Sequence, residues 1–273
     1  MYMSGACRGR DADRERERAT LQVCVCVMAG AKGAVVRAQG FGATVYLVAF
    51  NVASCVGWGY LLYLLVRHLT VEGGSWTSVG LNPHIMFTLQ VVQSSAILEV
   101  VHSLMGLVRS GAFTVLVQVV SRLFVTWGIL ALPFVSVSSS EFVTTLLVAW
   151  SLSEVIRYPF YAWSTLKLYG AVGEAPFVMA WLRYSGFLVL YPMGVLSEIA
   201  LSLLALPMLY STDYLSFSMP NTLNVSFSYT LFVSFSLLLY LPGFPFLFGT
   251  MLANRKSALS KYASPTKKTE KLA

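Results

Sequence analysis

The sequence predicts an all-α integral membrane protein built as a bundle of six transmembrane helices. Of its 273 residues, 56% are hydrophobic and only 11% are charged, whereas a soluble domain is about one quarter charged. The apolar residues gather in stretches of about 20, the length that crosses a bilayer as a helix. We place the six helices near residues 43–66, 84–108, 113–132, 142–162, 179–204 and 228–252.

The two ends of the chain differ from the spans in composition. Residues 1–42 contain a mixed-charge run at Arg8–Arg18 and are predicted to form a disordered cytosolic tail. The apolar run Leu21–Gly30 resembles the core of a signal peptide, but the acidic residues before it favour an ordinary tail. Residues 253–273 form a second, basic tail. The expected organisation is therefore a catalytic membrane domain at 43–252 between two cytosolic tails.

The basic residues predict the orientation. Lys and Arg concentrate in both tails, at Arg109 and in the 163–183 connection, and the rule that cytosolic segments are positive places both termini in the cytosol. The net charge of +7 lies mainly in the tails rather than on a face interleaved with aromatic side chains. This pattern excludes nucleic acid as a partner.

The stretch Leu182–Glu198 carries the strongest functional signal. It is apolar enough to cross a membrane, yet it contains Tyr191 and Glu198 seven residues apart. Seven residues are close to two helical turns, so both side chains share one face, separated by a rise of roughly 10 Å. An ionisable group at that depth is a candidate functional site.

Other polar side chains of the spans are predicted to lie in one layer in the cytosolic half of the membrane. They are Glu99, His102, Arg122, Glu154, Arg157 and Tyr158. One interpretation is a set of ion pairs, Glu154 with Arg157 and Glu99 with Arg122, that lock the helices together. Because buried ion pairs are a poor source of stability, a polar cavity open to the cytosol explains the whole layer better.

Several chemistries are excluded by their motifs. Glu99 and His102 form an E-x-x-H unit, but the chain has three histidines and no second unit of this kind, which argues against a di-iron site or another metal centre. The spacing from His102 to Arg109 is that of a tyrosine-phosphatase loop, but Ser103 occupies the position of the nucleophilic cysteine. Neither metal-dependent oxidation nor phosphatase chemistry is expected.

Longer motifs carry a resemblance to a known family. They are WSLSEVIRYPFY at Trp150–Tyr161, Arg183-Tyr184, Leu190-Tyr191-Pro192-x-Gly194-x3-Glu198, Leu98-Glu99-x2-His102-x3-Gly106, Gln118-Val119-x-Ser121-Arg122 with Trp127, and Pro220-Asn221-x2-Asn224-Val225-Ser226-Phe227-x-Tyr229. This order of motifs, from about residue 44 to 252, resembles the 3-hydroxyacyl-CoA dehydratases of very-long-chain fatty acid elongation, also called the protein-tyrosine-phosphatase-like family. Ser103 departs from the cysteine of some members.

The resemblance implies a six-helix lyase of the endoplasmic reticulum that removes water from 3-hydroxyacyl-CoA to give trans-2-enoyl-CoA. It assigns Tyr191 and Glu198 as the catalytic pair and requires no cofactor. The implied partners are the acyl-CoA substrate, membrane lipid and other elongation-cycle enzymes, namely the condensing enzyme and the reductases.

The chemistry of Tyr191 and Glu198 suggests which of them is the acid and which is the base. Tyr191 is expected to act as base and Glu198 as acid or proton relay, on either side of the substrate, although the opposite assignment stays open. A cation that activates Tyr191 would be Arg157 or Arg122, because free tyrosine titrates near 10. The kink expected at Pro192 would open this face to the cavity.

The phosphates of CoA must stay in water at the cytosolic face. The candidates to hold them are Lys167, Arg183, Arg255 and Lys256. For each of these residues, anchoring at the cytosolic surface is an equally good interpretation.

Two other classes of function compete with the enzyme. The first is a catalytically silent scaffold that binds elongation enzymes, against which the presence of both Tyr191 and Glu198 argues. The second is a transporter, for which an inverted repeat would be expected and none is seen in the sequence.

Overall fold

The structure is a computed structural model that describes residues 40–108, 111–220 and 224–263. Most of these residues are helical, and the others form turns and loops with one isolated antiparallel bridge between Phe217 and Phe227. The all-α class predicted from the sequence is confirmed. The predicted N-terminal tail up to residue 39 and the end of the C-terminal tail lie outside the described residues.

Five segments are long and apolar enough to cross a membrane. They are Phe41–Thr70, Pro83–Leu104, Ala112–Leu130, Phe177–Thr212 and Tyr229–Ser260. Each corresponds to one of the six predicted spans. The remaining prediction, residues 142–162, lies within the 29-residue helix α7 (Glu141–Tyr169), which is not among the five. The protein is thus a helical membrane protein with five candidate spans, and the sixth stays a prediction.

Three of the five segments are interrupted along their length. The helices concerned are α3 (Pro83–Ser95) and α4 (Ile97–Leu104), α5 (Ala112–Leu123) and the π-helix η2 (Phe124–Leu130), and α8 (Phe177–Ser185) and α9 (Phe187–Thr212). The last break is at Gly186, whose missing side chain leaves room for the carbonyl of Leu182, 2.9 Å from where a Cβ would lie. The stretch 182–198 therefore begins on α8 and continues on α9.

The described helices form two compact units. One contains α4 and α5, within residues 95–122, and the other contains the rest of the described chain. The larger unit also includes the short helices η1 (Val79–Leu81) and α6 (Val135–Ser138). The single catalytic domain predicted for 43–252 stays a prediction.

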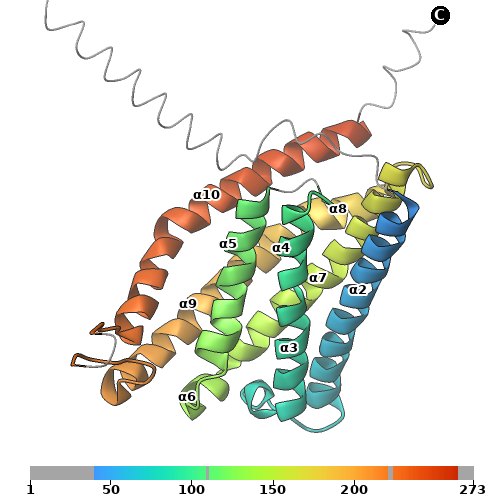
Figure 1. The fold of residues 1–273 in the computed structure, drawn as a ribbon. Coiled ribbons are helices and arrows are strands. Elements are labelled where there is room, and N and C mark those ends of the chain that lie inside the picture. Colours follow the sequence, from blue (N-terminus) through green and yellow to red (C-terminus); the bar gives the residue numbers. More distant parts are fainter. Residues whose placement is uncertain (1–39, 109–110, 221–223, 264–273) are drawn as a thin grey trace, which may run out of the picture. The chain divides into compact units, whose positions relative to one another are not determined.

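Within the larger unit, α7 is the central helix. It packs against α2 (Phe41–Thr70), α8 and α9, and α9 packs in turn against α10 (Tyr229–Ala263). Figure 1 shows α7 running between α2 and α9. This packing explains how α7 can carry polar residues, because Glu154 and Ser151 are covered by protein. The residues of the candidate site belong to three of these helices, α7, α9 and α10.

Helix α2 shows why the molecule suits a bilayer. It buries one side chain every three or four residues along a single stripe, from Thr44 to Leu65. Asn51, in the middle of that stripe, donates its side-chain amide to the carbonyl of Leu47 at 2.7 Å. The other faces expose large apolar side chains such as Val56, which is 65% exposed. An exposed apolar surface of this extent is unfavourable in water and suits contact with lipid.

The ends of α7 follow from capping residues. The hydroxyl of Ser140 accepts a hydrogen bond from the amide of Phe142 at 3.2 Å, which caps the first turn. The helix ends at Gly170, which has φ +89°, and the amide of Ala171 bonds back to Leu166 at 3.0 Å. The predicted end at residue 162 is too early because the helix continues through mixed polar residues until this glycine.

Helix α10 is also longer than predicted. It continues from Tyr229 to Ala263 instead of ending at residue 252, so the first residues of the predicted basic tail are helical. Figure 1 shows this helix bending along its course. Pro242 and Pro245 lie inside it and each removes one backbone donor, which accounts for a bend there.

Candidate active site

The Glu198 carboxylate lies where three helices meet. It belongs to α9 and is 9% exposed. One carboxylate oxygen, Oε1, accepts a hydrogen bond from Nε1 of Trp150 on α7 at 3.1 Å. The other, Oε2, accepts one from the hydroxyl of Tyr240 on α10 at 2.7 Å. Both oxygens therefore have donors, which a carboxylate removed from water needs.

Tyr191 lies on the same helix and faces α10. Helix α9 runs continuously from Tyr191 through Pro192 to Glu198, as the spacing predicts. The Tyr191 ring stacks on Phe244, with centroids 5.3 Å apart and planes 4° apart, and more loosely on Phe248 at 6.3 Å. Tyr191 and Glu198 interact electrostatically. The predicted pair thus shares one neighbourhood.

A single face of α10 serves both groups. Tyr240, Phe244 and Phe248 follow one another at intervals of four residues, the spacing of neighbours on one side of a helix. Tyr240 contacts Glu198, and the two phenylalanines contact Tyr191. Tyr240 also interacts electrostatically with both members of the pair.

A second polar cluster lies further along α7. Nε of Arg157 meets Oε2 of Glu154 at 2.5 Å, which confirms this predicted ion pair. The Arg157 guanidinium also lies over the rings of Tyr158 and Tyr161, 4.6 and 5.4 Å from their centroids. These three partners belong to its own helix. The predicted activation of Tyr191 by Arg157 stays a prediction.

Arg183 of α8 adds a second guanidinium to this cluster. Its Nη2 donates to the hydroxyl of Tyr161 at 3.1 Å, and its guanidinium lies 5.5 and 5.9 Å from the ring centroids of Tyr161 and Tyr184. Tyr161 therefore has an arginine from each of two helices beside it.

The other basic candidates for the CoA phosphates are differently placed. Lys167 forms an ion pair with Glu174, and both side chains are well exposed. Nε of Arg255 donates to the hydroxyl of Ser185 at 3.1 Å, which joins α10 to α8. Lys256 is exposed. Arg183 and Arg255 are therefore the two candidates whose guanidinium groups are positioned by hydrogen bonds to another helix.

The remaining predicted polar residues belong to the smaller unit. Glu99 and His102 lie on α4 and interact electrostatically, and His102 is 3% exposed. Arg122 is in the last turn of α5. The pairing of Glu99 with Arg122, and the single layer expected for all six residues, stay predictions.

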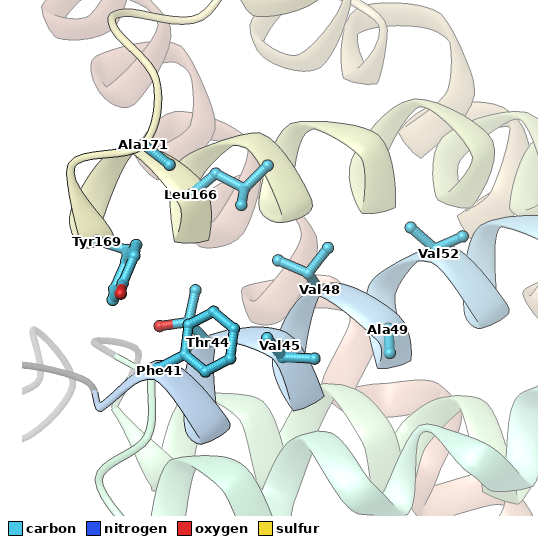
Figure 2. Close-up of a pocket in the computed structure, with 9 residues that line it drawn as sticks. All are labelled: Phe41, Thr44, Val45, Val48, Ala49, Val52, Leu166, Tyr169 and Ala171. Atoms are coloured by element: carbon cyan, nitrogen blue, oxygen red, sulfur yellow. The ribbon is translucent and has the colours of Figure 1, made fainter.

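A hollow in the structure lies apart from the candidate pair. It is an apolar groove of about 420 Å³ between the start of α2 and the end of α7. Figure 2 shows its lining, which includes Phe41, Val48, Leu166 and Tyr169. None of the predicted site residues lines it. It is therefore not the polar cavity that the sequence predicts.

Comparison with known proteins identifies the family. The family model described as protein tyrosine phosphatase-like protein, PTPLA, matches residues 93–261. The chain belongs to this family. Tyr191, Glu198, Trp150 and Tyr240 all lie within the matched range.

Similar proteins cover most of the chain. The very-long-chain (3R)-3-hydroxyacyl-CoA dehydratase PASTICCINO 2 of Arabidopsis thaliana is 42% identical over 217 residues, which are 80% of this chain and 94% of that protein. PASTICCINO 2A of Oryza sativa subsp. japonica is 41% identical, over 86% of this chain and 98% of its own. The very-long-chain (3R)-3-hydroxyacyl-CoA dehydratase 1 of Canis lupus familiaris is 37% identical, over 82% and 86%. No solved structure matches the chain.

Two residues that donate hydrogen bonds to Glu198 were not predicted from the sequence. Trp150 opens the longest motif, but nothing in the motif indicates a bond to a residue 48 positions away. Tyr240 belongs to no motif. Its only signal is the four-residue spacing with Phe244 and Phe248, and this pattern is also typical of an ordinary packing face.

Proposed function

We propose that this protein is a carbon–oxygen lyase of the fatty acid elongation cycle. It removes water from very-long-chain 3-hydroxyacyl-CoA and leaves trans-2-enoyl-CoA. The names of its relatives support this reaction. The structural observation that carries it is the buried Glu198 carboxylate, held by donors from two other helices, on the same helix as Tyr191.

The proposed reaction combines removal of the C2 proton with departure of the protonated C3 hydroxyl as water. A base removes the proton from C2, the C2–C3 double bond forms, and the C3 hydroxyl leaves as water with a proton from the acid. The two donors to Glu198 suit an ionised carboxylate, so in this proposal Glu198 receives the C2 proton and Tyr191 supplies the other. This assignment reverses the one first expected from the sequence. No cofactor is needed for these steps.

The proposal includes α7 as the sixth membrane span. At a rise of about 1.5 Å per residue, a helix of this length reaches well beyond the roughly 30 Å of a hydrocarbon core. Its intramembrane polar residues, Glu154 and Tyr158, are buried against protein. With six spans both termini lie on one side, and the basic residues of the tails favour the cytosol for that side. The resemblance to the elongation-cycle dehydratases is the reason for proposing the endoplasmic reticulum as the membrane.

Arg183 is the proposed contact for a CoA phosphate. Its partners within the described residues are the rings of Tyr161 and Tyr184 and one hydroxyl, all of them neutral. Its charge is therefore available to an anion, and a guanidinium binds phosphate in a two-pronged geometry. Lys167 is already paired with Glu174, which makes it the weaker candidate.

The function is tested with the full-length protein purified in detergent and returned to liposomes. Given 3-hydroxyacyl-CoA of graded chain length, it should form trans-2-enoyl-CoA, measured by mass spectrometry, and Tyr191→Phe should abolish the product. Absence of product at every chain length would reject the dehydratase. Co-purification with the condensing enzyme or reductases, without dehydration, would instead favour the scaffold.

A further inference from the structure

The contact between Tyr240 and Glu198 links two helices that both contribute to the site. The Tyr240 hydroxyl is 2.7 Å from Oε2, and 42 residues separate the two positions in the chain. Helix α10 is otherwise largely exposed to its surroundings and buries few side chains. The hydrogen bond to the buried Glu198 carboxylate therefore distinguishes Tyr240 from most other residues of this helix.

The local sequence of α10 explains how Tyr240 is presented. Pro242 and Pro245 follow it, and Phe244 lies one turn further on. The near-parallel stacking of Phe244 on Tyr191 fixes the position of this turn against α9. The same turn therefore sets the Tyr240 hydroxyl beside Glu198, so α10 is aligned by one member of the pair and contacts the other.

The two donors to Glu198 restrict how the carboxylate can turn. A carboxylate has two oxygens and about four acceptor sites. Trp150 occupies a site on Oε1 and Tyr240 occupies one on Oε2, and the two donors belong to different helices, α7 and α10. Because the donors pull on different oxygens, the carboxylate cannot rotate without breaking one of the two bonds. Loss of Tyr240 would remove the hydrogen bond that α10 donates to Oε2.

We propose that Tyr240 is a positioning residue that, together with Trp150, fixes the Glu198 carboxylate in the orientation required for dehydration. This role rests on the proposed function. Tyr240 acts through Glu198 and need not touch the substrate. A misplacement of about 1 Å at a reacting group costs about 10²-fold in rate, so a loosened carboxylate should lower kcat more than it weakens binding.

The test is Tyr240→Phe, which removes one oxygen and keeps the ring. We expect kcat to fall by about 10- to 100-fold, with KM for the acyl-CoA changing by less than about threefold. Trp150→Phe should give the same split between kcat and KM, because it removes the other donor.

Tyr229→Phe is the matched control. Tyr229 lies on the same helix, is 7% exposed, and donates its hydroxyl to the carbonyl of Gly128 at 2.8 Å. It loses a hydrogen bond of similar length, but not one to Glu198. Its kcat per folded molecule should stay at the wild-type value. If Tyr240→Phe keeps the wild-type kcat, or loses no more than Tyr229→Phe, the positioning role is wrong.

An infrared measurement separates this inference from the reaction itself. The difference spectrum between wild type and Glu198→Gln isolates the carboxylate band of Glu198. That band should shift in Tyr240→Phe and stay in place in Tyr229→Phe. An inactive wild type with a shifted band would reject the proposed function and keep the contact. An unshifted band would overturn the inference, whatever the activity.

Discussion

Glu154 and Glu198 are two buried carboxylates with different kinds of partner. Glu154 is 3% exposed and meets Arg157, a cation three residues along the same helix. Glu198 is 9% exposed and accepts hydrogen bonds from Trp150 and Tyr240, which belong to two other helices. The first carboxylate has a cation on its own helix, and the second has donors on two other helices.

The difference indicates two roles. The Glu154–Arg157 pair can form as soon as α7 is helical, and it allows a charged helix to be buried. The contacts of Glu198 exist only when α7, α9 and α10 are assembled, and they set the direction of its oxygens. Local pairing serves stability, and the hydrogen bonds between helices serve orientation, so substitutions in the two places should fail in different ways.

The largest expected effect is that of Glu198→Gln on activity. A glutamine can keep both hydrogen bonds, with its carbonyl facing the indole N–H of Trp150 and its amide donating to the Tyr240 oxygen, because a tyrosine hydroxyl can also accept. Stability should therefore stay near wild type, whereas loss of the proton acceptor should lower the dehydration rate by about 10²- to 10⁴-fold. Turnover in liposomes and thermal unfolding in detergent measure the two quantities. Wild-type turnover in this variant would remove Glu198 from the chemistry.

The two sites also differ in what the sequence reveals. Glu154 and Arg157 are close in sequence and helix geometry alone brings them together, so the sequence could offer their pairing as one interpretation, and the structure shows that pair. Tyr191 and Glu198 share a helix face for the same reason. Tyr240 could not be assigned to Glu198, because its contact depends on how α10 packs on α9, and no local spacing encodes that packing.

The next effect in size is that of Arg157→Leu on stability. It leaves the Glu154 carboxylate buried without the cation beside it, and breaking a buried pair in this way costs about 3–5 kcal/mol. The free energy of unfolding in detergent should fall by that amount, while kcat per folded molecule should fall far less than in Glu198→Gln. The double variant Glu154→Gln with Arg157→Leu should recover much of the loss. Equal destabilisation of the single and double variants would contradict the role assigned to this pair.

Helix α7 is the one predicted span that is not among the five candidate spans. The other predicted spans are continuous apolar segments, and most of their residues are not buried inside the protein. Helix α7 is covered by α2, α8 and α9, so it can carry Glu154, Arg157 and several hydroxyl side chains. Its start and end were set by Ser140 and Gly170, which are local signals, but its role in the bundle depends on the packing of its neighbours.

The smallest expected effect is on KM, and it distinguishes Arg183 of α8 from Lys167 near the end of α7. Lys167 and Glu174 form an ion pair whose side chains are 43% and 74% exposed, and exposed pairs contribute about 0–1 kcal/mol, so Lys167→Ala should change neither stability nor KM noticeably. Arg183 has neutral partners, and a charged hydrogen bond to phosphate contributes about 1.5–3 kcal/mol, so Arg183→Ala should raise KM by about 10-fold or more.

A matched pair of substrates decides whether the Arg183 effect belongs to the nucleotide end of CoA. Each variant is compared on the hydroxyacyl-CoA and on the corresponding pantetheine thioester, which lacks the nucleotide and its phosphates. Arg183→Ala should raise KM for the CoA ester and leave KM for the pantetheine ester unchanged, because only the first carries the group that the guanidinium binds. An equal rise with both substrates would mean that Arg183 acts by holding Tyr161 and the turn of α7 around it. Arg183 would then resemble Arg157 as a structural cation, and the phosphate contact would have to be sought at Arg255.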